Sequence, residues 1–579
     1  MRTEPGSRGR WGWRLPLAGA VCLLSACGGD SPLPTEGARV RPPGAPSRLL
    51  NPACDPAGTT HAGGTISTAV TWAAAGSPHV VLGTVTLATG GTLTIQPGAT
   101  VCLGSSVGLH STGGRLVARG LDTARILFTA HDLAQPWDGI HLQGTPPSGS
   151  QVRNARVEHV APYSTAIAAD DHVLFVDSTV VRQAGAGVRI GGRHGRFADS
   201  RVDTTTNPGV PAATLGDSAR FEDFVVRGAA GTGMLIDGTS NVRVLGGRIE
   251  GSGGVGIRAP HETGVVSVKN VRVVGGQGYP IETTPPMLQR LYGSNAANQD
   301  SLKGNARDTV VMLGGVLHHP LTVRAGLPWR VTAELVIGAG GELLAEPGSA
   351  MVMDSAGAIT ALADARLRLR GTAASPVVLT AADPAVGWLG ILLASIPSAP
   401  SYITSARVEH VAADRPAVND AGWHPVRIDS VVFRRTGQAV RLWAAGSRLT
   451  RSRVDTTLAL HLAAVELGGN AILESTLIRG AAQGGVSIHD AAVQVQSCEV
   501  RESGMYGIWL FENAPVHDCN LVDNGWGGLY VVFGTLTADA TGNWWGDPGG
   551  PTAPGANGVT GSANYTPWRT TPVVLPYVP

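Results

Sequence analysis

A short repeat runs through most of this 579-residue chain, and it is the feature that most constrains the fold. Each repeat has an apolar anchor residue, a small residue seven positions later and a second apolar residue at position eight, as in Ile249, Gly256 and Ile257. The anchors, 21 to 24 residues apart, are Val157, Val180, Val202, Val226, Ile249, Val273, Val408, Val432, Val454, Ile478, Val500 and Leu521. Because a repeat of this length cannot bury an apolar face alone, successive repeats must stack as coils.

A longer repeat of 251 to 252 residues is superimposed on the short one. Residues 156–160 (Arg-Val-Glu-His-Val) recur at 407–411, and residues 200–205 recur at 452–457. The short repeats are rich in Val and Ile and are bounded by Gly, Asn or Asp, and this composition favours β-strands. We therefore predict an all-β fold, a right-handed parallel β-helix of about 20 coils that rises about 4.8 Å per coil. Two tandem modules are expected, at 58–306 and 307–568, followed by a tail at 569–579.

Several short motifs point to a known group of proteins. They are residues 92–98 (Thr-Leu-Thr-Ile-Gln-Pro-Gly), 125–130, 137–140 (Trp-Asp-Gly-Ile), 543–548 (Asn-Trp-Trp-Gly-Asp-Pro) and 565–568. Together they resemble the secreted bacterial repeat proteins of the pectin-lyase-like fold, which implies a β-helix and a surface location. That family includes lyases, hydrolases, adhesins and proteins without known activity, so function has to be argued from sites. Residues 543–546 are expected to cap the last coil, because open strand edges invite aggregation.

The N-terminus has the pattern of a targeting segment. Four arginines precede an apolar run at 15–26, which is too short to span a bilayer. The run ends in Leu-Ser-Ala-Cys27, which resembles the lipobox of bacterial lipoproteins and implies cleavage before Cys27 and diacylation of its thiol. We expect a signal peptide at 1–27, a flexible Pro/Gly/Ser-rich tether at 28–57, and an outer-membrane or cell-surface lipoprotein whose partner is the membrane. The alternative is an ordinary secretory signal with a chance cysteine.

The charge balance bears on the expected partners, and the cysteines bear on the expected disulfides. Lys and Arg number 44 against 43 Asp and Glu, so nucleic acid is not an expected partner. We expect a monomer without cofactor or metal, since no group of residues has metal-ligand spacing. Cys54 and Cys102 could staple the N-terminal cap, whereas Cys498 and Cys519 fit either a stacked pair of thiols or a disulfide.

Charged residues directly after the anchors are the candidate catalytic groups. They are Glu158, Asp203, Arg227 and Glu250, which should form a solvent-facing column. Glu158 and Asp203 would lie two coils, or about 9–10 Å, apart, near the upper limit for the carboxylates of an inverting glycosidase. Alternating charges on neighbouring coils also form salt-bridge ladders that need no catalytic role.

Two aromatic residues are the candidate ligand-binding groups. Trp509 and Tyr530 each stand nine residues after an anchor, so their rings should face solvent about 5 Å apart. The turns nearby contain His489, Asp490, Glu512 and Asn513. This composition suits carbohydrate, whose flat face stacks on a ring while polar groups bind its hydroxyls. The alternative is an aromatic cross-strand pair that only stabilises the sheet.

Three functions are compatible with these patterns. The first is non-catalytic binding of carbohydrate or of a surface partner. The second is a polysaccharide lyase or glycoside hydrolase that works on the charged column, and whether the protein is an enzyme stays open. The third is a structural spacer without ligand.

Overall fold

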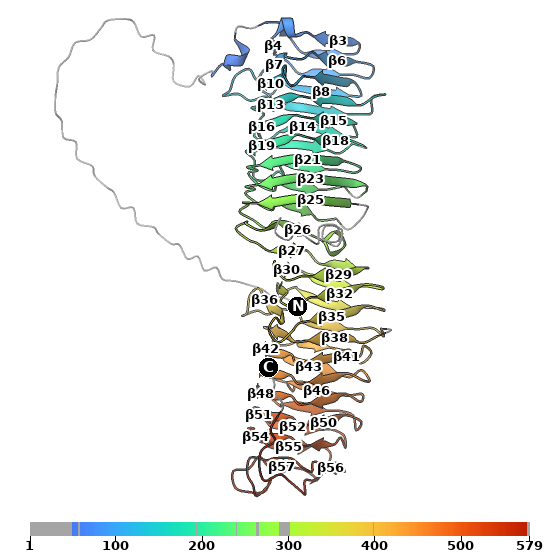
Figure 1. Ribbon diagram of the computed structural model, residues 1–579, viewed down its shortest axis with the longest axis vertical. Helices are drawn as coiled ribbons and strands as arrows, with labels where there is room; N and C mark the ends of the chain where they lie inside the picture. Colours follow the sequence, from blue (N-terminus) through green and yellow to red (C-terminus); the bar gives the residue numbers. More distant parts are fainter. Residues whose placement is uncertain are drawn as a thin grey trace, which may run out of the picture. The chain divides into compact units, whose positions relative to one another are not determined.

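The computed structural model describes residues 49–55, 58–192, 194–238, 240–261, 266–288, 302–397, 399–535 and 537–575. They belong to one compact unit, Arg48–Pro579, in which strands stack coil upon coil and neighbouring coils pair in parallel (Figure 1). The predicted parallel β-helix of about 20 coils is therefore confirmed. The expected signal peptide, Cys27 and most of the expected tether lie outside the described residues. Within the described ranges, no helix has both the length and the apolar character needed to cross a membrane.

Most coils contribute three short strands, as in β13 (Ala155–Glu158), β14 (Thr165–Asp170) and β15 (Leu174–Asp177). At β21 (Arg220–Arg227), β23 (Val242–Glu250) and β25 (Val266–Val274) the third strand of one coil runs into the first strand of the next. Side chains alternate between the inside and the outside of the coil. The inward residues form one continuous apolar core along the stack. The backbone N–H and C=O groups bond to the coils on either side, so the outward residues of successive coils line up in columns.

The strands that carry the candidate sites lie in three sheets. In the first half they are β8 (Gly108–Thr112), β11 (Gly139–Gln143), β16 (Val180–Ala184), β19 (Arg201–Thr205), β21 (Arg220–Arg227), β23 (Val242–Glu250) and β25 (Val266–Val274). In the second half they are β34 (Ala358–Ala361), β37 (Ile391–Leu393), β39 (Ala406–Glu409), β42 (Val432–Thr436), β43 (Gln438–Leu442), β46 (Val465–Leu467), β49 (Val486–Ile488), β52 (Tyr506–Leu510) and β55 (Gly527–Val531).

The register corrects two of the predicted anchors. Val157 pairs with Val181 rather than Val180, and Val408 pairs with Phe433 rather than Val432. Val181 and Phe433 are fully buried, whereas Val180 and Val432 are partly exposed. The sequence offers two adjacent apolar residues at both places, and the corner before the strand decides which one points inward.

The two halves of the chain form one continuous stack, but equivalent strands lie in different sheets. β26 (Ile281–Thr283), the second strand of its coil, pairs with β27 (Val310–Met312), the first strand of the next coil. As a result β13 lies in the 16-stranded sheet, whereas β39, which begins 251 residues later with the same Ala-Arg-Val-Glu sequence, lies in the sheet of 20 strands that runs from β2 (Gly64–Ile66) to β54 (Asn520–Val522). Among the described residues between β26 and β27 there is a helical turn at 285–288 but no third strand.

A disulfide at one end and buried side chains at the other hold the ends of the stack. A disulfide joins Cys54 to Cys102 at the N-terminal end, whereas Cys498 and Cys519 are buried free thiols. At the other end Trp545 is fully buried, and the Asn543 side chain accepts from the N–H of Cys519 at 2.8 Å. Residues of the expected cap therefore contact the last coils directly.

A buried histidine braces one corner of the coil in each half. Nε2 of His172 lies 2.7 Å from Ser150 Oγ, and Nε2 of His424 lies 2.7 Å from Ser401 Oγ. Each serine also accepts a backbone N–H from the preceding coil, that of Leu116 or Leu367. Burial lowers the pKa of His424 to about 4, an effect only partly offset by its hydrogen bond with Ser395.

This histidine makes the stability of the fold depend on pH. In the folded protein His424 takes up a proton only near pH 4, whereas in the unfolded chain it does so near pH 6.5. The contribution of the neutral His424 to stability is therefore fully present above pH 6.5 and is lost as the pH falls to about 4. We expect the free energy of unfolding to fall by up to about 3 kcal/mol over this window. Urea unfolding monitored by circular dichroism tests this. In His424→Asn the decrease should be clearly smaller, and an equal decrease in both proteins would contradict the assignment.

Candidate functional site

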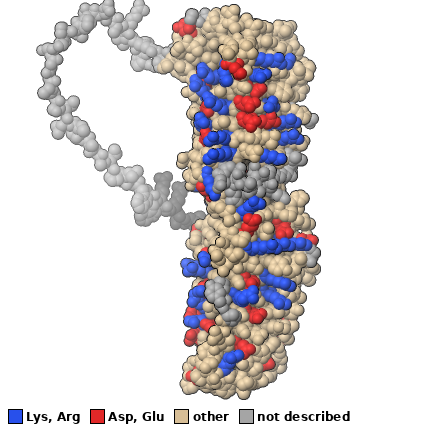
Figure 2. All heavy atoms as spheres, viewed as in Figure 1, with Lys and Arg blue, Asp and Glu red and all other residues tan. Residues whose placement is uncertain are grey.

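The predicted charged column exists, and it is a ladder of opposite charges. The register places Glu158, Arg182, Asp203, Arg227 and Glu250 on successive coils. Arg182 Nε lies 2.7 Å from Glu158 Oε2, and Arg227 Nε lies 3.0 Å from Glu250 Oε2. On the face shown in Figure 2, positive and negative side chains lie close together along the coils. The column therefore has the arrangement expected of a stabilising ladder.

Glu158 was expected to face solvent, and this expectation is wrong. Its side chain is 4% exposed, because the long side chains of Arg156 and Arg182 fold over the carboxylate, with Nε atoms 2.9 and 2.7 Å from Oε2. Thr129 contacts the other carboxylate oxygen at 3.5 Å and also bonds to His159 Nδ1 at 3.0 Å. Burial and the two guanidinium groups lower the pKa of His159, although Glu158 raises it. A carboxylate held this way is shielded from a substrate.

Asp203, Arg227 and Glu250 do reach the surface, but they are also engaged. Asp203 pairs with Arg201 of its own strand at 2.8 Å, and Glu250 also pairs with Arg248. The described structure thus brings the four candidate catalytic residues into one column, with a charged partner for each. We find no open carboxylate pair among them.

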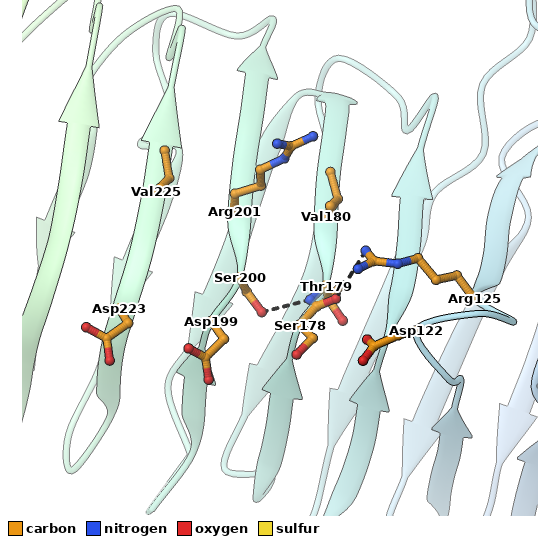
Figure 3. Close-up of a pocket in the computed structure, with 10 residues that line it drawn as sticks. All are labelled: Asp122, Arg125, Ser178, Thr179, Val180, Asp199, Ser200, Arg201, Asp223 and Val225. Carbon is orange, nitrogen blue, oxygen red and sulfur yellow. Dashed lines mark hydrogen bonds between the residues drawn. The ribbon is translucent and has the colours of Figure 1, made fainter.

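A polar groove of about 580 Å³ crosses neighbouring coils beside this column (Figure 3). One wall is the turn with Asp122 and Arg125, and the floor follows the corners of later coils at Ser178, Asp199 and Asp223. These three corner residues have positive φ angles of 47 to 49°, which let the chain turn within one residue. Of the four candidate catalytic residues, none lines this groove in the part of the chain that the structure describes.

A smaller groove, of about 250 Å³, lies at the matching corner of the second half. It is lined by Thr372, Ala373, Pro376, Ser405 and Ser430, among others. Arg407 is the single charged residue among the described residues of its lining. The grooves therefore arise from a wide turn followed by tight corners, and their chemistry differs between the halves.

Aromatic side chains gather on the last coils of the second half. Trp443, His489, Phe511 and Phe533 follow the ends of β43, β49, β52 and β55, and we call them the aromatic row. Ring centroids lie 5.5 Å apart for Trp443 and His489, 4.5 Å for His489 and Phe511, and 6.2 Å for Phe511 and Phe533. Exposure reaches 37% for Trp443 and 53% for Phe533.

The local sequence explains how Trp443 reaches a ring two coils away. The buried carboxylate of Asp420 accepts the backbone N–H groups of Trp443 and Ala444 at 2.7 and 2.9 Å, which fixes the turn. On the coil between, a Cβ at position 468 would press on the indole at 3.0 Å, so Gly468 leaves room for the ring to lie flat. The indole Nε1 donates to Glu466 at 3.1 Å, and the Arg441 guanidinium lies 5.3 Å from the ring centroid.

The predicted pair Trp509 and Tyr530 lies beside this row, on adjacent paired strands. Both rings are partly buried, and the ring that stacks on Tyr530 is that of Tyr506, with centroids 4.9 Å apart. His489 belongs to the aromatic row, where burial and the nearby Arg441 lower its pKa while Glu466 raises it. Asp490 is partly exposed, and Glu512 and Asn513 are exposed in the turns.

Sequence reasoning missed Trp443, Phe511 and Phe533. Counted from the corrected anchors, these residues stand at positions ten, eleven and twelve, in the turn that follows the second strand of the coil. The signal was present, because aromatic residues recur in one turn of several repeats.

Comparison with known proteins adds nothing to this geometry: no protein-family model and no curated protein matches the chain.

The ladder predicts different roles for two glutamates at matching positions. In Glu158→Gln, loss of the charge between two arginines should lower the free energy of unfolding by about 1–3 kcal/mol. Glu409, which pairs in register with Arg434, has no ion pair within 4.0 Å among the described residues, so Glu409→Gln should change it by less than about 0.5 kcal/mol. Urea unfolding of the two variants measures the difference, and equal effects would contradict the ladder.

Proposed function

We propose that this protein is a non-catalytic β-helix that binds polysaccharide along its last coils. The aromatic row is the observation that carries the proposal. Aromatic rings offer flat apolar surface to sugar rings, and polar side chains at the edge of such a surface fix the orientation of the hydroxyls. Arg441 and Glu466 supply such groups beside the row, within one register column that continues through Ser487 to Trp509 and Tyr530.

The position of the row supports a chain-like ligand over a small molecule. Its rings come from strands that pair from coil to coil, β43 to β46, β49, β52 and β55, so the row follows the axis of the stack. The matching turns of the first half carry Gly191, Asp237 and Pro260 directly after β17 (Ala186–Ile190), β22 (Met234–Ile236) and β24 (Ile257–Ala259). The aromatic residues are thus not required by the coil, which favours a role in recognition.

The charged column gives less support to a lyase or hydrolase. A general acid or base needs access to substrate, whereas Glu158 is covered by two arginines. Among the described residues that line the groove in the first half there is no aromatic side chain, which also makes this groove the weaker carbohydrate site. An anchored binding protein further fits the lipobox-like sequence at Cys27, and we extend the proposal to a location at the outer membrane or cell surface.

A polysaccharide array read for both binding and cleavage tests this function. The chain from Gly28 onward should bind at least one polysaccharide without forming product. The double variant Trp443→Ala and Phe533→Ala should bind at least about tenfold more weakly, equal to about 1.4 kcal/mol, because two exposed rings are lost. Trp509→Ala with Tyr530→Ala should weaken binding in the same direction.

Phe175→Ala is the matched control, since Phe175 is an exposed aromatic residue, 40% accessible, on β15 of the first half. Its binding should equal that of the unmodified chain. Product formation that disappears in Asp203→Ala would instead establish an enzyme. Absence of both binding and cleavage would favour the structural spacer.

A further inference from the structure

A cluster of two histidines and one aspartate lies on the first half, away from the aromatic row. His110 and His141 are register partners on β8 and β11, and Asp138 directly precedes β11. One ligand atom of each residue lies within 4.8 Å of those of the other two, and all three side chains are partly exposed. No pattern in the sequence indicates this group, because its residues come from two coils and only the stacking brings them together.

The distances in the cluster fit a metal ion better than a hydrogen bond. His110 Nε2 is a buried atom without a hydrogen-bond partner among the described residues, and it lies 3.4 Å from Asp138 Oδ2. Two ligands bonded to zinc at about 2.0–2.1 Å in tetrahedral geometry lie about 3.3–3.4 Å apart. The imidazole and the carboxylate thus already have the separation of neighbouring ligands.

The backbone orients the ring of the other histidine, His141. His141 Nε2 lies 2.8 Å from the carbonyl oxygen of Asp138, which can only accept, so Nε2 carries the proton and Nδ1 keeps a free lone pair. Ser164 Oγ lies 3.2 Å from the same nitrogen. Metal-binding histidines commonly donate their second N–H to a carbonyl in this way.

Glycines make room for both rings. A Cβ at Gly108 would collide with the His110 ring, and one at Gly139 would lie 3.1 Å from His141 Nε2. Both glycines stand two residues before a histidine on the same side of the sheet, so each ring folds back over bare backbone toward Asp138.

The second half shows that the coil does not need these polar side chains. Thr360 and Leu392 are the register partners on β34 and β37 that correspond to His110 and His141, and Leu389 corresponds to Asp138. The neighbouring tryptophan and glycine are kept, as Trp388 and Gly390. Leu389 and Leu392 are 40% and 38% exposed, so the fold accepts apolar residues at these places.

We propose that His110, Asp138 and His141 bind a divalent transition-metal cation, with zinc as the representative ion. Two imidazoles and one carboxylate are ligands that zinc prefers, whereas calcium and magnesium favour sites made of oxygen ligands. Three protein ligands leave a fourth position for water or for a group of a partner. This site is independent of the proposed carbohydrate face.

Equilibrium dialysis of the untagged chain against zinc chloride tests the site. One zinc per chain should bind with a Kd of about 1 µM or tighter, and excess calcium should not compete. The triple variant His110→Thr, Asp138→Leu and His141→Leu, which copies the second half, should lose this zinc while keeping its circular dichroism spectrum. His110→Ala alone should weaken binding at least about tenfold, or about 1.4 kcal/mol.

His318→Ala with His319→Ala is the control for adventitious binding, because these adjacent histidines are exposed. That variant should keep the tight zinc. The proposal is overturned if the unmodified chain binds no zinc, or if His110→Ala binds it with unchanged affinity.

Discussion

Parallel strand pairing between successive coils is the interaction on which every other feature of this protein depends. Each strand satisfies its backbone hydrogen bonds through the coils on either side, so no coil is stable without its neighbours. The same pairing turns each outward position of the repeat into a column. The charge ladder, the aromatic row and the cluster around His110 all depend on that alignment. Their contacts between coils join residues far apart in sequence, for example Glu158 with Arg182 at 24 residues and Trp443 with His489 at 46.

The two halves share this framework and differ in what they place on it. The first half carries a charged groove and the His110 cluster, whereas the second carries a mostly uncharged groove and the aromatic row. A charged column is common to both, since Arg479 Nε lies 2.6 Å from Asp455 Oδ1 in the second half. Trp137 in the first half and Trp388 in the second are both fully buried. Each donates its indole N–H to the backbone carbonyl of the glutamate 21 residues later, Glu158 or Glu409. The core is thus alike at this position while the surface differs between the halves, so a function is best sought on the columns that differ.

The fold could be predicted because it follows from the repeat itself. The sites were predicted only in part, for reasons of register and side-chain length. The sequence does not show whether Val180 or Val181 points inward, because both are apolar. Taking Val180 as the anchor left Arg182 out of the predicted charged column. Glu158 occupies the predicted column but is buried, because arginine side chains bend over it. The change of sheet at β27 comes after residues 284–309, whose sequence contains no repeat, so the sequence pattern could not predict it.

The central claim is that hydrogen bonds between coils continue without a break across the two halves, through the pairing of β26 with β27. Hydrogen–deuterium exchange of a Val311→Pro variant tests it most directly, since proline removes one N–H from the middle of β27. In one continuous stack, exchange should rise on both sides of the junction, in β24 and β26 and in β27 and β30 (Trp329–Val331). Faster exchange only beyond residue 307, with full protection of β24 and β26, would contradict the account.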